Sequence, residues 1–167
     1  MSRDLVDQLL AQWRHERPDQ DVSGLGLVVR VELLAKCLQR ETGRVLGELG
    51  LKTWEYDVLS ALRRQGSPYE LPATRLASDS LLSTGAMTTR IDQLEDKGWV
   101  RRAPDPDDRR GIRVILTPRG KTLVNRAFKA RLSAAESSLE ALETTERESV
   151  DGGLRKLMVW HENAAPG

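Results

Sequence analysis

Residues 73–117 are ordered as a short helix, a tight turn, a capped helix and a β-hairpin, and this order constrains the fold more than any other feature. The stretch ATRLASD (73–79) is expected to form the short helix. Ser83 or Thr84 can cap the next helix, and Gly98 is a typical C-terminal stop. Its buried stripe has helical spacing and consists of Met87, Ile91 and Leu94. Two helices joined in this way predict a helix-turn-helix.

Two short β-prone runs follow, WVRR (99–102) and GIRVILT (111–117), separated by a turn rich in Pro and Asp. In the second run Ile112, Val114 and Leu116 share one face, and Arg113 points to the other. A hairpin directly after a helix-turn-helix makes the motif winged. We expect the wing arginines to lie beside a phosphate backbone and to pair with Asp107 and Asp108; they are Arg109, Arg110 and Arg113.

The outer face of the capped helix carries small and hydroxyl-bearing side chains. At 100° per residue from Met87, this face consists of Gly85, Thr88 and Thr89, with Asp92 behind them. Short hydroxyl side chains beside a glycine let a helix approach bases or phosphates closely. We therefore predict DNA contacts from Ser83, Thr84, Thr88 and Thr89, although solvated surface residues would look the same. Residues 74–121 also hold 10 Lys+Arg against 7 Asp+Glu, in a chain of net charge +1.

Amphipathic helices are also expected at both ends of the chain, over 3–16, 24–46, 51–65, from Thr117 to about 138, and from Thr144. Their apolar stripes are Leu5, Leu9 and Trp13; Leu27, Val31, Leu34 and Leu38; and Val150, Leu154, Leu157 and Met158. The stretch GSPYELP (66–72) is expected to be a loop. The fold class is thus mainly α: a winged helix-turn-helix with a two-stranded hairpin wing and terminal dimerisation helices. One integrated domain would comprise N-terminal dimerisation helices (1–50), the DNA-binding part (51–121) and C-terminal dimerisation helices (122–163).

Several protein classes are disfavoured by composition. No apolar stretch approaches the roughly 20 residues that a membrane span needs, and MSRDLVDQLL has acidic residues that a signal peptide lacks. A single cysteine, Cys37, cannot form an internal disulfide, so we expect a cytoplasmic protein. His15 and His161, the only histidines, lie in opposite end helices and have no metal-ligand spacing. Without a nucleophile–base pairing or a Gly-rich phosphate loop, we expect no enzyme, metal or cofactor.

The stretch LASDSLLSTGAMTTRIDQLEDKGWVRRAPDPDDRRGIRVILTPRGK resembles the DNA-binding core of the MarR family of bacterial transcription regulators. Its signature is the recognition helix, LEDKG, two arginines, DPDDRR, a strand and LTPRG, and the resemblance covers about residues 51–125. The resemblance implies a ligand-responsive transcription regulator, which we expect to be a repressor. Such a protein would bind a pseudo-palindromic double-stranded DNA operator as a homodimer whose N- and C-terminal helices interleave.

The extra N-terminal helix with QWRHERPDQD is similar to a subgroup that includes urate-responsive repressors. In that subgroup a Trp of the first helix, an Asp of the helix before the motif and an Arg of the recognition helix line an anion site. The matching positions are Trp13, Asp57 and Arg90, which implies a small anionic effector such as urate or a related aromatic or carboxylate metabolite. From the residues alone, Trp13 can equally be a core residue, and Asp57 and Arg90 can be a structural ion pair.

Two further functions stay open. Some family members sense oxidants through one thiol near the dimer helices, and Cys37 is the candidate for such a redox switch here. The sequence shows no cationic cluster around it that would favour the thiolate, so an inert thiol is the simpler interpretation. The other possibility is a winged-helix protein-interaction module that does not contact DNA.

Overall fold

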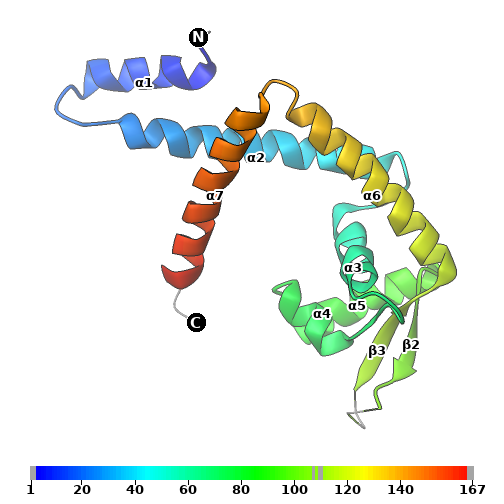
Figure 1. Ribbon diagram of the computed structural model, residues 1–167. Coiled ribbons are helices and arrows are strands. Elements are labelled where there is room, and N and C mark those ends of the chain that lie inside the picture. Colours follow the sequence, from blue (N-terminus) through cyan, green and yellow to red (C-terminus); the bar gives the residue numbers. More distant parts are fainter. Residues whose placement is uncertain (1–2, 107, 109–110, 165–167) are drawn as a thin grey trace.

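The computed structural model describes residues 3–106, 108 and 111–164. In these residues the chain forms seven helices and three strands. In chain order they are α1 (Leu5–Glu16), α2 (Ser23–Gly47), α3 (Thr53–Arg64), β1 (Glu70–Pro72), α4 (Ala73–Asp79), α5 (Thr84–Asp96), β2 (Val100–Pro104), β3 (Ile112–Leu116), α6 (Pro118–Ser138) and α7 (Thr144–Ala164). The predicted fold class, mainly α with a winged helix-turn-helix, is confirmed (Figure 1).

The wing sheet has one strand more than predicted. β2 and β3 form the expected antiparallel hairpin, in which Val100 pairs with Leu116. The segment expected to be a loop contains β1, which pairs with the other edge of β3, so that the strand order is β1-β3-β2. Three residues ending in Pro72 give no alternating pattern, and proline is tolerated only at a sheet edge or strand end. Pairing with β3 therefore defines this strand more than its own sequence does.

The main hydrophobic core lies inside the winged helix-turn-helix. It is formed by α3, α4, α5, the sheet and the start of α6. The predicted stripe of α5, namely Met87, Ile91 and Leu94, is fully buried and therefore confirmed. One acidic side chain, Glu55 of α3, is also buried in this part of the fold. Its carboxylate accepts hydrogen bonds from the backbone N–H of Lys52 at 2.9 Å and from Lys97 Nζ at 2.5 Å, which joins α3 to the end of α5.

The start of α6 is built tightly onto the turn that follows α5. Thr117 caps α6 and accepts a hydrogen bond from the Gly120 backbone N–H at 3.0 Å, and its hydroxyl lies 2.8 Å from the carbonyl oxygen of Gly98. A Cβ atom on Gly120 would lie 2.1 Å from the carbonyl oxygen of Trp99. Only glycine fits this close approach, which explains the glycine of LTPRG.

The buried face of α1 differs from the predicted stripe. Val6 and Leu10 are buried, whereas Leu5 is exposed and Trp13 keeps 49% of its surface exposed. α1 lies on the first half of α2 (Figure 1), where Leu10 covers Gly26 closely enough that a Cβ there would lie 2.7 Å from Leu10 Cδ1. The contact with α2 thus selects which of two adjacent apolar faces becomes buried.

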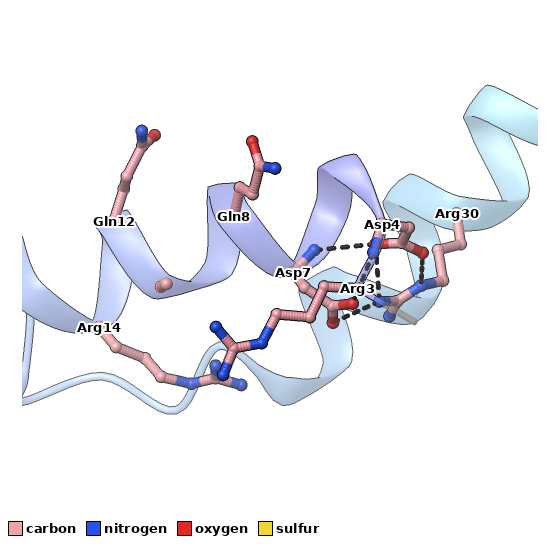
Figure 2. A pocket seen from close by; sticks show the side chains of 8 residues that line it. Arg3, Asp4, Asp7, Gln8, Gln12, Arg14 and Arg30 are labelled. Carbon is pink, nitrogen blue, oxygen red and sulfur yellow. Dashed lines mark hydrogen bonds and ion pairs between the residues drawn. The ribbon is translucent and has the colours of Figure 1, made fainter. Parts of the chain in front are cut away.

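An arginine of α2 holds α1 in this position. The Arg30 guanidinium donates to the Asp4 carboxylate at 2.8 Å and to the Asp7 carboxylate at 2.7 Å (Figure 2). Asp4 caps α1 by accepting from the Asp7 backbone N–H, so these ion pairs act on the first turn of the helix. The Arg30 guanidinium lowers the pKa of the Asp4 carboxyl to about 2.

The apolar stripes of α2 and α7 are not covered by any other described part of the chain. α7 stands apart from the winged helix-turn-helix (Figure 1), and none of its side chains is buried among the described residues. The predicted stripe residues of both helices are exposed; they are Leu27, Val31, Leu34, Leu38, Val150, Leu154, Leu157 and Met158. Exposed apolar surface of this extent is typical of an interaction face.

Candidate nucleic-acid interface and effector site

The N-terminal end of α5 is the centre of the candidate DNA interface. Of the two predicted caps, Ser83 is the one observed: its hydroxyl oxygen accepts from the Ala86 backbone N–H at 3.3 Å. Thr84 is the first helical residue and is exposed. The free backbone N–H groups of a helix start and its partial positive charge both favour a phosphate nearby.

The outer face of α5 is shallow and polar, as predicted. The hydroxyls of Thr88 and Thr89 donate to the carbonyl oxygens of Thr84 and Gly85 at 2.9 and 3.3 Å. Each hydroxyl oxygen keeps acceptor capacity for an outside donor. A Cβ atom on Gly85 would meet nothing within 4 Å, so the helix surface is open at this point. The four predicted DNA-contacting side chains of this region are thus all exposed.

An arginine of the wing fixes the recognition helix to β2. The backbone N–H of Arg102 donates to the Glu95 carboxylate at 2.8 Å, and its guanidinium forms ion pairs with Glu95 and Asp92. The same guanidinium lies 3.4 Å from the carbonyl oxygen of Thr88. Nothing in the sequence distinguishes Arg102 from Arg101, because both belong to the same short β-prone run.

The wing base is held by the third predicted wing arginine. The Arg113 guanidinium pairs with Glu70 of β1 at 3.1 Å and with the largely buried Asp105 at 3.0 Å. These carboxylates raise the pKa of Arg113, with Asp105 the largest cause. Asp107, Arg109 and Arg110 lie outside the described residues, so the expected pairing of Asp107 and Asp108 with these two arginines stays a prediction. Sequence reasoning overlooked Glu70 and Asp105 because their approach to Arg113 depends on strand pairing.

Two of the three predicted effector residues lie near each other. Asp57 of α3 is exposed, and the Arg90 guanidinium of α5 stacks on the ring of Trp54, 5.1 Å from its centroid. Desolvation raises the pKa of Asp57, partly offset by attraction to Arg131, then Arg64 and then Arg90. Among the described residues Arg90 thus makes a cation–π contact with Trp54 and no ion pair with Asp57.

The third predicted effector residue lies elsewhere in the chain. Because Asp4 and Asp7 contact Arg30 while Leu10 covers Gly26, α1 runs antiparallel to α2. Trp13 therefore lies towards the N-terminal end of α2, whereas α3 follows the C-terminal end of α2 (Figure 1). Because α2 has 25 residues, its two ends are about 37 Å apart. A single chain does not bring Trp13 to Asp57 and Arg90.

Cationic side chains that the sequence did not suggest surround Asp57. A groove of about 450 Å³ between α3 and α6 is lined by Asp57, Arg63, Arg64 and Arg131 together with Phe128. The Arg131 guanidinium lies 5.0 Å from the ring centroid of Tyr56, and Arg63 donates to Asn125 at 2.9 Å. All of these lie on predicted helices, but which helix faces meet is a tertiary property that periodicity does not reveal.

The remaining candidate residue, Cys37, is an exposed free thiol on α2. Its Sγ lies 3.6 Å from a guanidinium nitrogen of Arg40, one helical turn further along. The sequence showed no cationic cluster around this thiol, and the structure places one arginine beside it. Among the described residues no group of histidine, cysteine and acidic side chains could hold a metal ion. No described helix is both long and apolar enough to cross a membrane.

Known proteins resemble both the sequence and the fold. The profile of the MarR family matches residues 53–112. The HTH-type transcriptional regulator PecS of Dickeya dadantii is 30% identical over 142 residues, which cover 85% of this chain and 86% of the relative. MarR of Salmonella typhimurium is 35% identical over 78 residues, covering 47% of this chain and 52% of the relative.

The solved structures agree in fold. AbsC, a MarR family transcriptional regulator from Streptomyces coelicolor, aligns with a TM-score of 0.73 at 19% identity, covering 86% of this chain and 97% of the other. A second MarR family regulator from the same organism, solved in complex with DNA, aligns with a TM-score of 0.72 at 24% identity over 89% of this chain and 96% of the other.

Proposed function

Because this chain belongs to the MarR family of transcriptional regulators, we propose that it is a repressor that binds a pseudo-palindromic DNA operator as a homodimer and leaves it when a small anion binds. The observation that carries this proposal is the exposed, shallow and hydroxyl-rich face of α5 beside a wing fixed to the same helix. A helix presented in this way fits the major groove of B-DNA.

In the proposed complex, α5 reads the major groove through its four hydroxyl side chains, Ser83, Thr84, Thr88 and Thr89. The wing reaches the neighbouring phosphates, where Arg109 and Arg110 supply the charge. Arg113 has mainly a structural role in this proposal, because its ion pairs with Glu70 and Asp105 hold the wing in position.

We further propose that two copies interleave their terminal helices. The apolar stripes of α2 and α7 are exposed in the single chain and supply a large apolar surface for a partner. Residues 1–50 and 122–163 would then provide the dimer contacts and 51–121 the DNA contacts, within one integrated unit. Two recognition helices related by a two-fold axis match an operator with two-fold symmetry.

The effector site is proposed at the Asp57 and Arg90 side chains, between the dimer helices and the winged helix-turn-helix. Because α1 of the same chain is remote from it, the ring that stacks on the effector would be Trp13 of the second protomer. A flat anion suits this combination, since a guanidinium pairs with its charge while an indole covers its face. A preference of about 1.4 kcal/mol for the DNA-incompatible arrangement is enough for tenfold release.

Fluorescence anisotropy of a labelled duplex from the protein's own promoter tests this proposal. Wild-type protein is titrated in the presence of urate, xanthine, aconitate, citrate or salicylate. Arg90→Ala is expected to bind the duplex but lose anion-induced release, and Trp13→Phe to need more anion with DNA affinity nearly intact. Variants that respond like wild type would show that the effector binds elsewhere.

The principal alternative is a winged-helix protein-interaction module without DNA contact. A gel shift with the same promoter duplex separates it from a regulator, because the module would not retard the duplex above its effect on random DNA. Light scattering of the free protein tests the dimer independently: a monodisperse monomer at micromolar concentration would contradict interleaved helices.

A further inference from the structure

The turn of the helix-turn-helix contains an apolar residue in an unfavourable backbone conformation. Leu81, between α4 and α5, has a φ of 52°, in the left-handed region, and 95% of its surface is exposed. A side chain with a Cβ atom is disfavoured in this region, and glycine is the usual occupant. Leucine here thus carries both backbone strain and full contact of an apolar side chain with water.

The same local structure occurs at two other helix ends, and both use glycine. At the end of α4, the backbone N–H groups of Leu82 and Leu81 donate to the carbonyl oxygens of Ala77 at 2.9 Å and Ser78 at 3.1 Å. This bond pair defines a Schellman cap, in which the left-handed residue follows the C-cap.

The matching pairs at the ends of α2 and α5 place a glycine at the left-handed position, with φ 71° at Gly50 and 69° at Gly98. The two caps have the same bonds as the α4 cap, from Leu51 to Leu46 and from Trp99 to Leu94. At both of these described caps the left-handed position is therefore a glycine. The fold does not require leucine at position 81.

The position of Leu81 indicates what it contacts. It lies two residues before Ser83, the N-cap of α5, and thus beside the helix end that helix-turn-helix proteins place against base edges. The neighbouring exposed side chains on this surface are small or hydroxyl-bearing, so Leu81 is the one fully exposed large apolar group of the described turn. In the major groove the base edges present one apolar group, the C5-methyl of thymine.

We propose that Leu81 is a specificity-determining residue whose side chain packs against a thymine methyl group in each operator half-site. The inference rests on the proposed DNA-binding function and adds a base preference to it. Contact with the methyl group removes both apolar surfaces from water, which balances the unfavourable exposure in the free protein.

Two variants separate this role from a structural one. Leu81→Gly relieves the backbone strain and is expected to raise Tm by about 2–4 °C, while its affinity for an operator falls about tenfold. Leu81→Ala keeps the strained φ and is expected to lose a similar affinity without the gain in Tm. A purely structural residue would not give a variant that is more stable and binds DNA less well.

The DNA for this experiment is a duplex selected by wild-type protein from a randomised library, with a random duplex as control. Both variants are expected to bind the random duplex like wild type, because the side chain makes no phosphate contact. If either variant keeps wild-type affinity for the selected duplex, Leu81 has no role in recognition. If wild-type protein selects no sequence, the proposed operator binding fails together with this inference.

Deoxyuridine tests the thymine methyl directly. Each thymine of the selected duplex is replaced in turn by deoxyuridine, which removes only the methyl group. At one thymine per half-site, the replacement is expected to weaken binding of the wild type several-fold and to leave Leu81→Ala unchanged, the sign of a coupled pair. Equal losses in both proteins at every thymine would overturn the assignment, even if Leu81→Ala binds weakly.

Discussion

Arg102 of the wing and Glu95 of the recognition helix are joined twice, because the Glu95 carboxylate accepts from both the backbone N–H and the guanidinium of Arg102. The backbone bond fixes where β2 leaves the helix, and the ion pair with the guanidinium fixes its direction. Asp92, one turn earlier on α5, binds the same guanidinium. These contacts of Arg102 join the wing to the recognition helix.

Loss of this joint should weaken operator binding without removing a phosphate contact. We expect Arg102→Ala to lower operator affinity about tenfold, or about 1.4 kcal/mol, while the slope of log Kd against log salt stays that of wild type. Arg101→Ala removes the same charge from the exposed neighbour on β2 and leaves the joint intact, so it is the matched control. Equal affinities of the two variants in anisotropy titrations would contradict a positioning role.

The wing arginines should divide into a DNA contact and a structural support. Arg110→Ala is expected to weaken binding to operator and random DNA alike and to flatten the salt slope by about one unit. Arg113→Ala should instead destabilise the fold by about 1–3 kcal/mol, because Glu70 and Asp105 lose the guanidinium they share. Salt titrations and thermal melts of both variants check this division, and a flattened slope with unchanged Tm for Arg113→Ala would reverse it.

The contact between α6 and the turn after α5 predicts a sharp dependence on one glycine. Gly120→Ala forces a methyl group against the carbonyl oxygen of Trp99 and should lower the free energy of unfolding by about 1–3 kcal/mol. Gly24→Ala is the control, since a Cβ there meets nothing within 4 Å and alanine favours the helix. If thermal denaturation gives the two variants equal Tm values, the turn after α5 accommodates the added methyl group without loss of stability.

Much of the fold was predictable because each long helix keeps an apolar stripe and each boundary has a local cause. Three predicted helix boundaries are observed. Ser83 and Thr117 cap the starts of α5 and α6, and Gly98 follows the end of α5. The prediction failed where a contact with another element of the chain determines the structure. β1 exists because β3 pairs with it, and α1 buries Val6 and Leu10 because Gly26 and Arg30 lie opposite.

The candidate site shows the same division. The outer face of α5 follows from counting 100° per residue, since all its members belong to one helix. Other contacts of the site join different elements of the fold. They are the ion pair of Arg102 with the recognition helix, the pairing of Arg113 with Asp105, and the approach of Arg131 to Asp57. No spacing along the chain encodes them, and no periodicity could show that Trp13 lies far from Asp57 within one chain.

The thiol of Cys37 should not be the sensor. It is exposed and near Arg40, but the described structure gives it one donor at 3.6 Å and no second thiol, since the chain has a single cysteine. We expect Cys37→Ser to bind the promoter duplex like wild type, with and without peroxide. If peroxide releases DNA from wild type but not from Cys37→Ser, the redox alternative replaces the anion effector, and Arg40→Ala then tests the role of the neighbouring guanidinium.

Asp57 predicts an unusual dependence of stability on pH. Although the Asp57 side chain is exposed, partial desolvation raises its pKa in the folded chain. Its ionised form therefore costs stability above that pKa, and the cost vanishes as pH falls below the unfolded value of about 3.9. Asp57→Asn cannot ionise and should therefore have a higher Tm than wild type at pH 7, with a gap that closes towards pH 4.

Asp19 provides a control of opposite sign for the same measurement. Arg17 lowers the pKa of Asp19 to about 2, so its ionised form contributes stability above the unfolded value, and this contribution is lost as pH falls through the folded one. Asp19→Asn should thus have a lower Tm than wild type at pH 7. Thermal melts of both variants between pH 4 and pH 7 measure the two gaps. A lower Tm for Asp57→Asn at pH 7 would mean that attraction to Arg131, Arg64 and Arg90 outweighs desolvation, and that Asp57 is ionised at no cost.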